Sequence, residues 1–182
     1  AIFYFLIQQI ENKFLQNNFF YRHSKYVAPD LIGCHLIKND KKNGLVKGII
    51  VETEAYSQEE ESCHGYLKMT PSNKTLFGEP GRFYVFKSYG IHYCLNVVTD
   101  KKNFASGVLI RAVSISDRDE RFAAGPGLVS KAYGIDSSFD SLKVSDNSIL
   151  WITKGQFINK ETDLIQTTRI GITKAKNIKW RW

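Results

Sequence analysis

The clearest structural signal in the chain is Arg82-Phe-Tyr-Val-Phe-Lys-Ser-Tyr-Gly-Ile-His-Tyr-Cys-Leu-Asn-Val-Val98. It contains two runs rich in β-branched and aromatic residues, 82–86 and 91–98, which are typical of strands. Between them lies Lys87-Ser-Tyr-Gly90, a short turn with a glycine where a positive φ is tolerated. The stretch therefore predicts a β-hairpin with Tyr89 at its tip.

Outward from the hairpin, the chain shows more strand patterns than helix patterns. Strands are predicted at 35–38, 45–56, 107–115, 148–153 and 167–172, and short helices at 29–33 and 128–133. Adjacent strands are joined by short turns, and strands do not alternate regularly with helices. This pattern predicts an α+β fold with a mostly antiparallel sheet.

Residues 1–26 are predicted to form an N-terminal helix and a lead-in, because Phe3, Leu6, Ile10 and Phe14 recur at helical spacing. No apolar run approaches the roughly 20 residues that span a bilayer, so we expect no membrane contact. The 3 cysteines stand at no framework spacing. They indicate free thiols in a reducing compartment.

The composition is basic and aromatic. Lys and Arg total 25 against 18 Asp and Glu, a formal net charge of +7, and aromatic residues make up 13%. The excess of basic residues lies in 1–50 and 151–182, on either side of a nearly neutral middle. Such a domain suits a polyanion with rings that stack, although an AT-rich genome would also enrich Lys, Asn, Ile and Phe.

Charged residues stand in two otherwise apolar strands. Alternation in 45–56 puts Glu52 and Glu54 on one face, and Arg111 lies alone within Val108-Leu-Ile-Arg-Ala-Val113. An arginine in such a strand needs a carboxylate partner. Two interpretations remain open: a solvated strand face with a structural ion pair, or a general base held by an arginine.

Two further features each allow two interpretations. The ring of Tyr89 either folds back on its own sheet or projects as a wedge between DNA bases. Cys63-His64 and His92-x-Cys94 together supply four potential zinc ligands. An adjacent Cys-His pair is not the spacing of a compact zinc site, so we predict no metal.

A series of motifs in a fixed order resembles a known family. The series comprises Val51-Glu-Thr-Glu-Ala-Tyr56, His64, Thr70-Pro-Ser-Asn73, Phe77-Gly-Glu-Pro-Gly81, Tyr84-Val-Phe-Lys-Ser-Tyr-Gly90, His92-Tyr-Cys-Leu-Asn96, Leu109-Ile-Arg-Ala112 and Gly125-Pro126. Together they resemble the alkyladenine DNA glycosylases, also called 3-methyladenine DNA glycosylases. The resemblance covers residues 27–174, and its specificity lies in the order of the motifs.

The resemblance implies a monofunctional enzyme of base excision repair that needs no cofactor. It would flip alkylated or deaminated purines out of double-stranded DNA and hydrolyse the N-glycosidic bond. The implied fold is a single compact domain over 1–182, around a curved antiparallel sheet with a protruding hairpin, similar to the C-terminal barrel of formyltransferases. We expect a monomer, cytoplasmic and associated with the nucleoid in a bacterium, or nuclear in a eukaryote. Family members continue through a further strand, so we expect either that this strand is truncated at Trp182 or that the enzyme is atypical.

The resemblance also assigns roles by motif position. Glu54 matches the general base that activates a water, and Arg111 matches the arginine that helps to position it. The residues that match the family's pocket for the extruded base are Tyr56, His64, Phe86 and Asn96. The residues that contact DNA are matched by Tyr89, which replaces the flipped nucleotide, and by Ile91 and His92.

The alternative function is a non-catalytic β-domain of the formyltransferase C-terminal type that binds RNA or DNA. Glu54 separates the two functions, because only an enzyme needs its carboxylate. A third function, a metal-dependent hydrolase using His64, His92 and the cysteines, predicts bound zinc.

Overall fold

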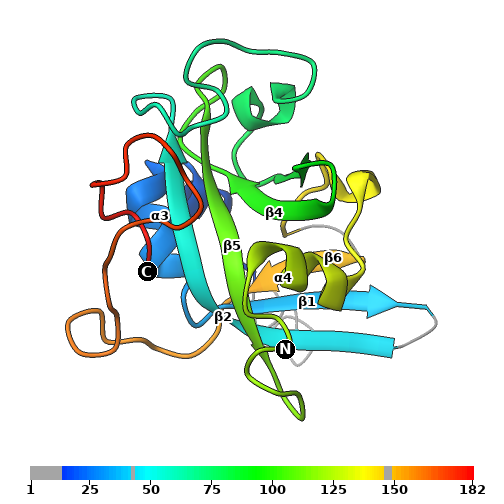
Figure 1. Ribbon diagram of the computed structural model, residues 1–182. Coiled ribbons are helices and arrows are strands. Elements are labelled where there is room, and N and C mark those ends of the chain that lie inside the picture. The colour runs from blue at the N-terminus through cyan, green and yellow to red at the C-terminus, as the bar shows by residue number, and fades with distance from the viewer. Residues whose placement is uncertain (1–13, 42–43, 146–148) are drawn as a thin grey trace, which may run out of the picture.

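The computed structural model describes residues 14–41, 44–145 and 149–182 (Figure 1). Its centre is a curled six-stranded sheet in which every paired neighbour is antiparallel, in the order β3-β4-β5-β2-β1-β6. The strands are β1 (His35–Asp40), β2 (Gly44–Ser57), β3 (Phe83–Ser88), β4 (His92–Val98), β5 (Ser106–Ile115) and β6 (Leu150–Thr153). The α+β prediction with a mostly antiparallel sheet is confirmed.

The helices are short. They are α2 (Asn17–Phe20), α3 (Ser24–Leu31) and α4 (Pro126–Tyr133), with the 3-10 turns η1 (Lys74–Phe77) and η2 (Ser137–Phe139). No helix in the described part of the chain is long and apolar enough to cross a membrane. The helix predicted from Phe3 to Phe14 lies outside the described residues, apart from Phe14 itself.

The predicted start of the second helix at Pro29 is wrong. The helix α3 begins at Ser24, because the Nδ1 atom of His23 accepts a hydrogen bond from the backbone N–H of Lys25 at 3.1 Å and caps it. Pro29 lies inside the helix, two residues before its end at Leu31. The proline has no N–H, so the bond that residue 29 would donate to the Lys25 carbonyl is missing from the helix.

The longest strand pairing, β2 with β5, contains an irregularity at its centre. The register shifts between Ile50 and Glu52 and again between Glu52 and Thr53, so that Val51 and Arg111 have no directly opposite partner. Such a bulge bends the strand and redirects its side chains. Here it brings Arg111 between the two carboxylates of β2.

The main core lies between the curled sheet and the helices α3 and α4. Helix α3 contacts β2 and β5, and helix α4 contacts β4 and β5. Fully buried side chains there include Phe20, Leu31, Phe83 and Tyr133. A second, smaller cluster is built by Cys63, Leu76, Phe77, Tyr84, Val98 and Ala105, with Tyr56 and Phe86 packed against it. Leu76, Tyr84, Tyr56 and Phe86 of this second cluster also line a cavity.

The predicted hairpin is confirmed as β3 and β4. Its turn closes with a hydrogen bond from the Ile91 N–H to the Ser88 carbonyl at 3.0 Å, and both central residues have positive φ, 50° at Tyr89 and 67° at Gly90. These are the features of a type I′ turn. Tyr89 is 87% exposed, so the interpretation in which its ring folds back on the sheet is wrong.

The C-terminal segment lies along the outer edge of β2, where Figure 1 shows it in red. Trp182 exchanges two backbone hydrogen bonds with Thr53, and the Ala55 N–H donates to the Trp180 carbonyl. The strand predicted at 167–172 is wrong, because only Thr167 forms a bridge, to Arg181. The residues after Thr167 instead curve around the side chain of Glu54.

Candidate active site

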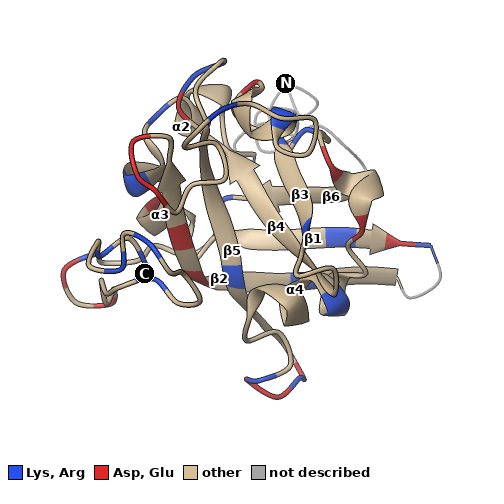
Figure 2. Ribbon diagram, turned by 45° about the horizontal axis from the view of Figure 1, so that its top comes forward, with Lys and Arg blue, Asp and Glu red and all other residues tan. Residues whose placement is uncertain are grey.

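The charged residues of β2 and β5 meet at the irregularity in the sheet. Glu54 has no exposed side-chain surface, and its Oε1 lies 3.3 Å from Nη1 of Arg111. Glu52 lies 3.5 Å from Nε of the same arginine, but 41% of its side chain is exposed. Figure 2 shows these acidic positions of β2 in red beside the single basic position of β5 in blue. The solvated-face interpretation is therefore wrong for Glu54.

Two further donors hold the Glu54 carboxylate. The Tyr56 hydroxyl donates to Oε2 at 2.7 Å, and the backbone N–H of Ile170 donates to Oε1 at 2.8 Å. A carboxylate has about four acceptor positions, so these donors and Arg111 fix its orientation and still leave acceptor capacity for one more donor. The buried group is therefore compensated by partners from β2, β5 and the C-terminal segment.

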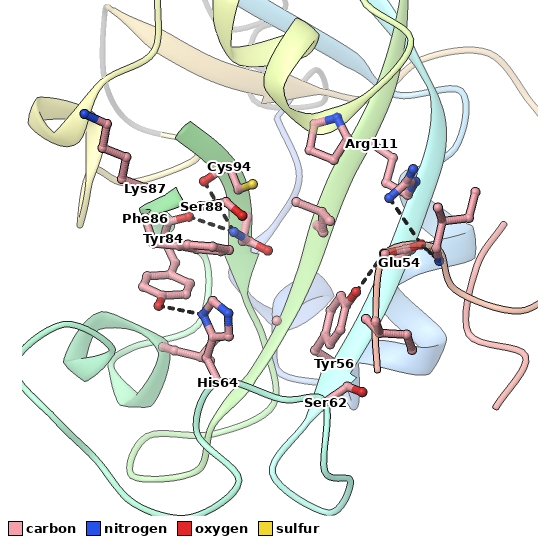
Figure 3. Close-up of a pocket in the computed structure, with 18 of the residues that line it drawn as sticks. Glu54, Tyr56, Ser62, His64, Tyr84, Phe86, Lys87, Ser88, Cys94 and Arg111 are labelled. Carbon is pink, nitrogen blue, oxygen red and sulfur yellow. Dashed lines mark hydrogen bonds and ion pairs between the residues drawn. The ribbon is translucent and has the colours of Figure 1, made fainter. Parts of the chain in front are cut away.

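A cavity of about 580 Å³ opens beside Glu54 (Figure 3). Seven of the nine predicted site residues line it, namely Glu54, Tyr56, His64, Phe86, Tyr89, Asn96 and Arg111. The volume is in the range of small-molecule sites, and most of the walls are aromatic or apolar. The geometry thus gathers residues from β2, β3, β4, β5 and the loop after β2 at one hollow.

Aromatic side chains form one side of the cavity. The rings of His64 and Phe86 have centroids 4.2 Å apart at 67°, and the Tyr84 hydroxyl is 3.3 Å from Nδ1 of His64. Tyr56 faces this cluster from β2, on the side of Glu54 (Figure 3). Burial lowers the pKa of His64, so its imidazole is neutral at neutral pH.

Two smaller side chains of β4 complete the wall. Asn96 is buried and its Nδ2 donates to the Tyr84 carbonyl at 3.2 Å, which fixes the orientation of the amide. Burial raises the pKa of the Cys94 thiol to about 11, so this cysteine is protonated at neutral pH. A protonated thiol is a poor nucleophile, which favours Cys94 as a packing residue.

The structure does not bring Ile91 and His92 into the cavity wall. Ile91 is 69% exposed near the hairpin tip. His92 packs against the start of α4, where a Cβ added to Gly127 would lie 2.9 Å from His92 Cγ. Glycine at 127 therefore allows the hairpin to sit close to α4.

The potential zinc ligands do not form one group. The Cys63 thiol contacts the Ala105 carbonyl in the second cluster, whereas His64 faces the cavity and His92 lies against α4. Among the residues that the structure describes, no three His, Cys, Asp or Glu side chains are grouped so that they could hold a metal ion.

Sequence reasoning did not single out Tyr84 and Ile170, which line this cavity, or the pair Glu60 and Arg169, which lies behind Tyr56. Tyr84 had a signal, because it alternates with Phe86 on the same face of β3. Ile170 acts through its backbone N–H, which carries no sequence signature. Glu60 and Arg169 lie in irregular segments far apart in the chain, and their ion pair has no periodic pattern.

Comparison with known proteins identifies relatives along nearly the whole chain. The family model described as Methylpurine-DNA glycosylase (MPG) matches residues 18–182. A protein of Trichodesmium erythraeum (strain IMS101) is 38% identical over 188 aligned residues, covering 94% of each chain. One of Carboxydothermus hydrogenoformans is 38% identical and covers 92% of this chain and 93% of its own. Both are named "Putative 3-methyladenine DNA glycosylase".

Together with the fold and the cavity, these matches define a DNA glycosylase, a hydrolase of N-glycosyl bonds. The chain belongs to the methylpurine-DNA glycosylase family, whose reaction is the removal of alkylated bases in base excision repair. The family resemblance inferred from the ordered motifs is thereby confirmed.

Proposed function

We propose that this chain is a monofunctional glycosylase that extrudes alkylated or deaminated purines from double-stranded DNA and hydrolyses their bond to the sugar. The observation that carries the proposal is the position of Glu54, a fully buried carboxylate held by Arg111 at a cavity lined with rings. A buried carboxylate is costly unless it is paired, and one that opens onto a cavity is a candidate general base.

In the proposed reaction, Glu54 accepts a proton from a water as the water oxygen bonds to C1′ of the sugar. The C1′–N bond breaks, and its electron pair leaves with the base. Arg111 and the Ile170 N–H contact Oε1, and the Tyr56 hydroxyl donates to Oε2, so these partners fix the carboxylate that is proposed to take the proton. No amine nucleophile is required, and no cofactor takes part.

The cavity favours damaged purines through its rings. An alkylated purine such as 3-methyladenine carries positive charge, and stacking against Tyr56 and Phe86 adds cation–π attraction of about 0.5–2 kcal/mol. A neutral His64 does not repel that charge. Asn96, whose amide is fixed in the wall, is proposed to clash with the amino group of normal guanine.

Tyr89 is the proposed wedge. A nucleotide must leave the stack before its base reaches the cavity, which costs a few kcal/mol. Tyr89 is exposed at the hairpin tip and also lines the cavity, so its ring can fill the space that the extruded nucleotide leaves. Ile91 and His92, next to the tip, are proposed to lie against the DNA.

The test is Glu54→Gln, which keeps the size of the side chain and removes the base. We expect release of 3-methyladenine from alkylated duplex DNA, measured by chromatography, to fall by about 10²–10⁴-fold, while binding to damaged duplex is retained. Glu52→Gln is the matched control, because it stands on the same strand and pairs with the same arginine. Because Glu52 is an exposed ion-pair partner, its substitution should slow base release by about fivefold at most.

Equal base release by the wild type and Glu54→Gln would contradict the catalytic assignment. Damaged-DNA binding by a wild type that releases no base would favour the binding domain without chemistry.

A further inference from the structure

A buried ion pair lies behind the cavity wall. Nη1 and Nη2 of Arg169 lie 2.8 and 2.9 Å from the two carboxylate oxygens of Glu60. The arginine side chain is fully buried and that of the glutamate is 5% exposed. Two parallel hydrogen bonds fix the plane of the guanidinium, which a single contact would not do.

The guanidinium fixed in this way contacts the two residues that follow Glu54 in β2. It stacks on the ring of Tyr56, with Cζ 4.7 Å from the ring centroid, and Nη1 donates to the Ala55 carbonyl at 2.9 Å. Trp180 lies on another side, at 5.6 Å. Tyr56, whose ring the guanidinium supports, is the same residue whose hydroxyl donates to Glu54.

A second route runs through the backbone. Arg169 directly precedes Ile170, whose N–H donates to Oε1 of Glu54 at 2.8 Å. Nη2 also contacts the Ala175 carbonyl at 3.3 Å, across the loop that carries Ile170. Holding Arg169 in place therefore holds the backbone donor in place, although the arginine itself does not touch the carboxylate.

We propose that Arg169, held by Glu60, is a positioning residue for base excision. It fixes the Tyr56 ring and the Ile170 amide against Glu54, and thereby orients the carboxylate toward the water. The inference rests on the function proposed above. Displacements of about 1 Å at a reacting centre cost about 10²-fold in rate, so a residue outside the cavity can still limit the chemistry.

The experiment compares Arg169→Lys, Arg169→Gln and the double variant Glu60→Gln/Arg169→Gln, which leaves no unpaired buried charge. Thermal unfolding first establishes that each variant is folded. The single-turnover rate constant is then measured with enzyme in saturating excess, so that an inactive fraction lowers the amplitude and not the rate. We expect a fall of at least about tenfold in both Gln variants and an intermediate loss in Arg169→Lys.

Arg22→Gln is the matched control. Arg22 pairs with Asp30 through one nitrogen at 2.8 Å, stacks over Phe19 at 4.8 Å and donates to the Phe19 carbonyl, so it makes the same kinds of contact from a side chain that is 37% exposed. It does not line the cavity. Its loss should lower stability and leave the single-turnover rate constant unchanged.

A second readout does not depend on activity. The exchange of the Ile170 amide hydrogen, followed by NMR, should be at least about tenfold faster in Arg169→Gln, with exchange at Val97 in the core unchanged. A wild type that excises no base would contradict the proposed function. The exchange rate of the Ile170 amide would still decide whether Arg169 holds that amide in position. Wild-type rate constants in the Gln variants, or unchanged exchange at Ile170 in Arg169→Gln, would overturn it.

Discussion

Tyr89 occupies a backbone conformation that tyrosine disfavours. In a type I′ turn both central residues need positive φ, which is why Asn-Gly and Asp-Gly dominate such turns. Here the pair is Tyr-Gly, and the Tyr89 φ of 50° costs about 1–2 kcal/mol for a residue with a bulky side chain. The ring is 87% exposed, so it gains little from packing in return. Backbone strain that no packing contact offsets is typical of functional positions.

Tyr89→Asn tests this interpretation, because asparagine tolerates the left-handed region. The variant should be more stable by about 1 kcal/mol, which raises Tm by roughly 2–4 °C in a domain of this size. It should also excise hypoxanthine from duplex DNA more slowly, because the wedge is lost. Calorimetry and single-turnover excision are the measurements. A variant that is both more stable and fully active would show that the strained tyrosine has no part in extrusion.

Residues could be predicted from the sequence where the local pattern made them anomalous. Glu54 and Arg111 were conspicuous because charges stood in apolar strands, and the structure pairs them at 3.3 Å. Glu60 and Arg169 were not conspicuous. A charged residue in an irregular segment is ordinarily solvated, and only the fold brings these two together across 109 positions. The pair Glu54 and Arg111 was therefore predictable, and the buried ion pair of Glu60 and Arg169 was not.

At the scale of elements, the hairpin is held by α4. The exposed His92 ring packs on Gly127 in the first turn of that helix, so that β4 and α4 approach closely. A methyl group at position 127 would lie 2.9–3.2 Å from three atoms of His92. Since His92 is three residues from Tyr89, a shift there changes the direction of the hairpin tip.

Gly127→Ala should therefore be destabilising, by about 1–3 kcal/mol, although alanine is the better helix former. It should also slow excision by displacing the tip. Adding His92→Ala removes the contacts to Cγ and Nδ1 and leaves the one to Cβ, so the double variant should recover part of the lost stability. Urea unfolding of the four proteins in this cycle gives the interaction energy. Additive effects of the two substitutions would mean that the contact does not set the spacing of β4 and α4.

The strands were predictable because alternation and turn residues are local signals, and β1 to β6 all appear where strands were expected. The segment 167–172 was the exception. Its β-branched residues suggested a strand, but the outer edge of β2 is taken by residues 180–182. The N–H of Ile170 is used by a carboxylate instead of a neighbouring strand. Long-range competition for a sheet edge leaves no mark on the local sequence.

At the scale of the whole molecule, the residues that carry the net positive charge are separate from those proposed to carry out the hydrolysis. The net charge of +7 comes from residues in both flanks of the sequence, whereas the cavity contains the internally compensated pair Glu54 and Arg111. Attraction of DNA phosphates should therefore depend on charges spread over the surface. The hydrolytic step should depend on contacts that are buried and weakly screened by salt.

This separation predicts different responses to salt. The Kd for a duplex with a damaged base should rise at least about tenfold between about 50 and about 200 mM KCl, because each phosphate contact releases a counterion. The single-turnover rate constant, measured with enzyme saturating at each salt concentration, should change less than about twofold, since the Glu54–Arg111 pair is shielded from solvent ions. Fluorescence anisotropy and quenched-flow excision give the two quantities. A flat Kd would mean that the basic flanks do not contact DNA, and a rate constant that falls in parallel with affinity would mean that salt reaches the buried pair.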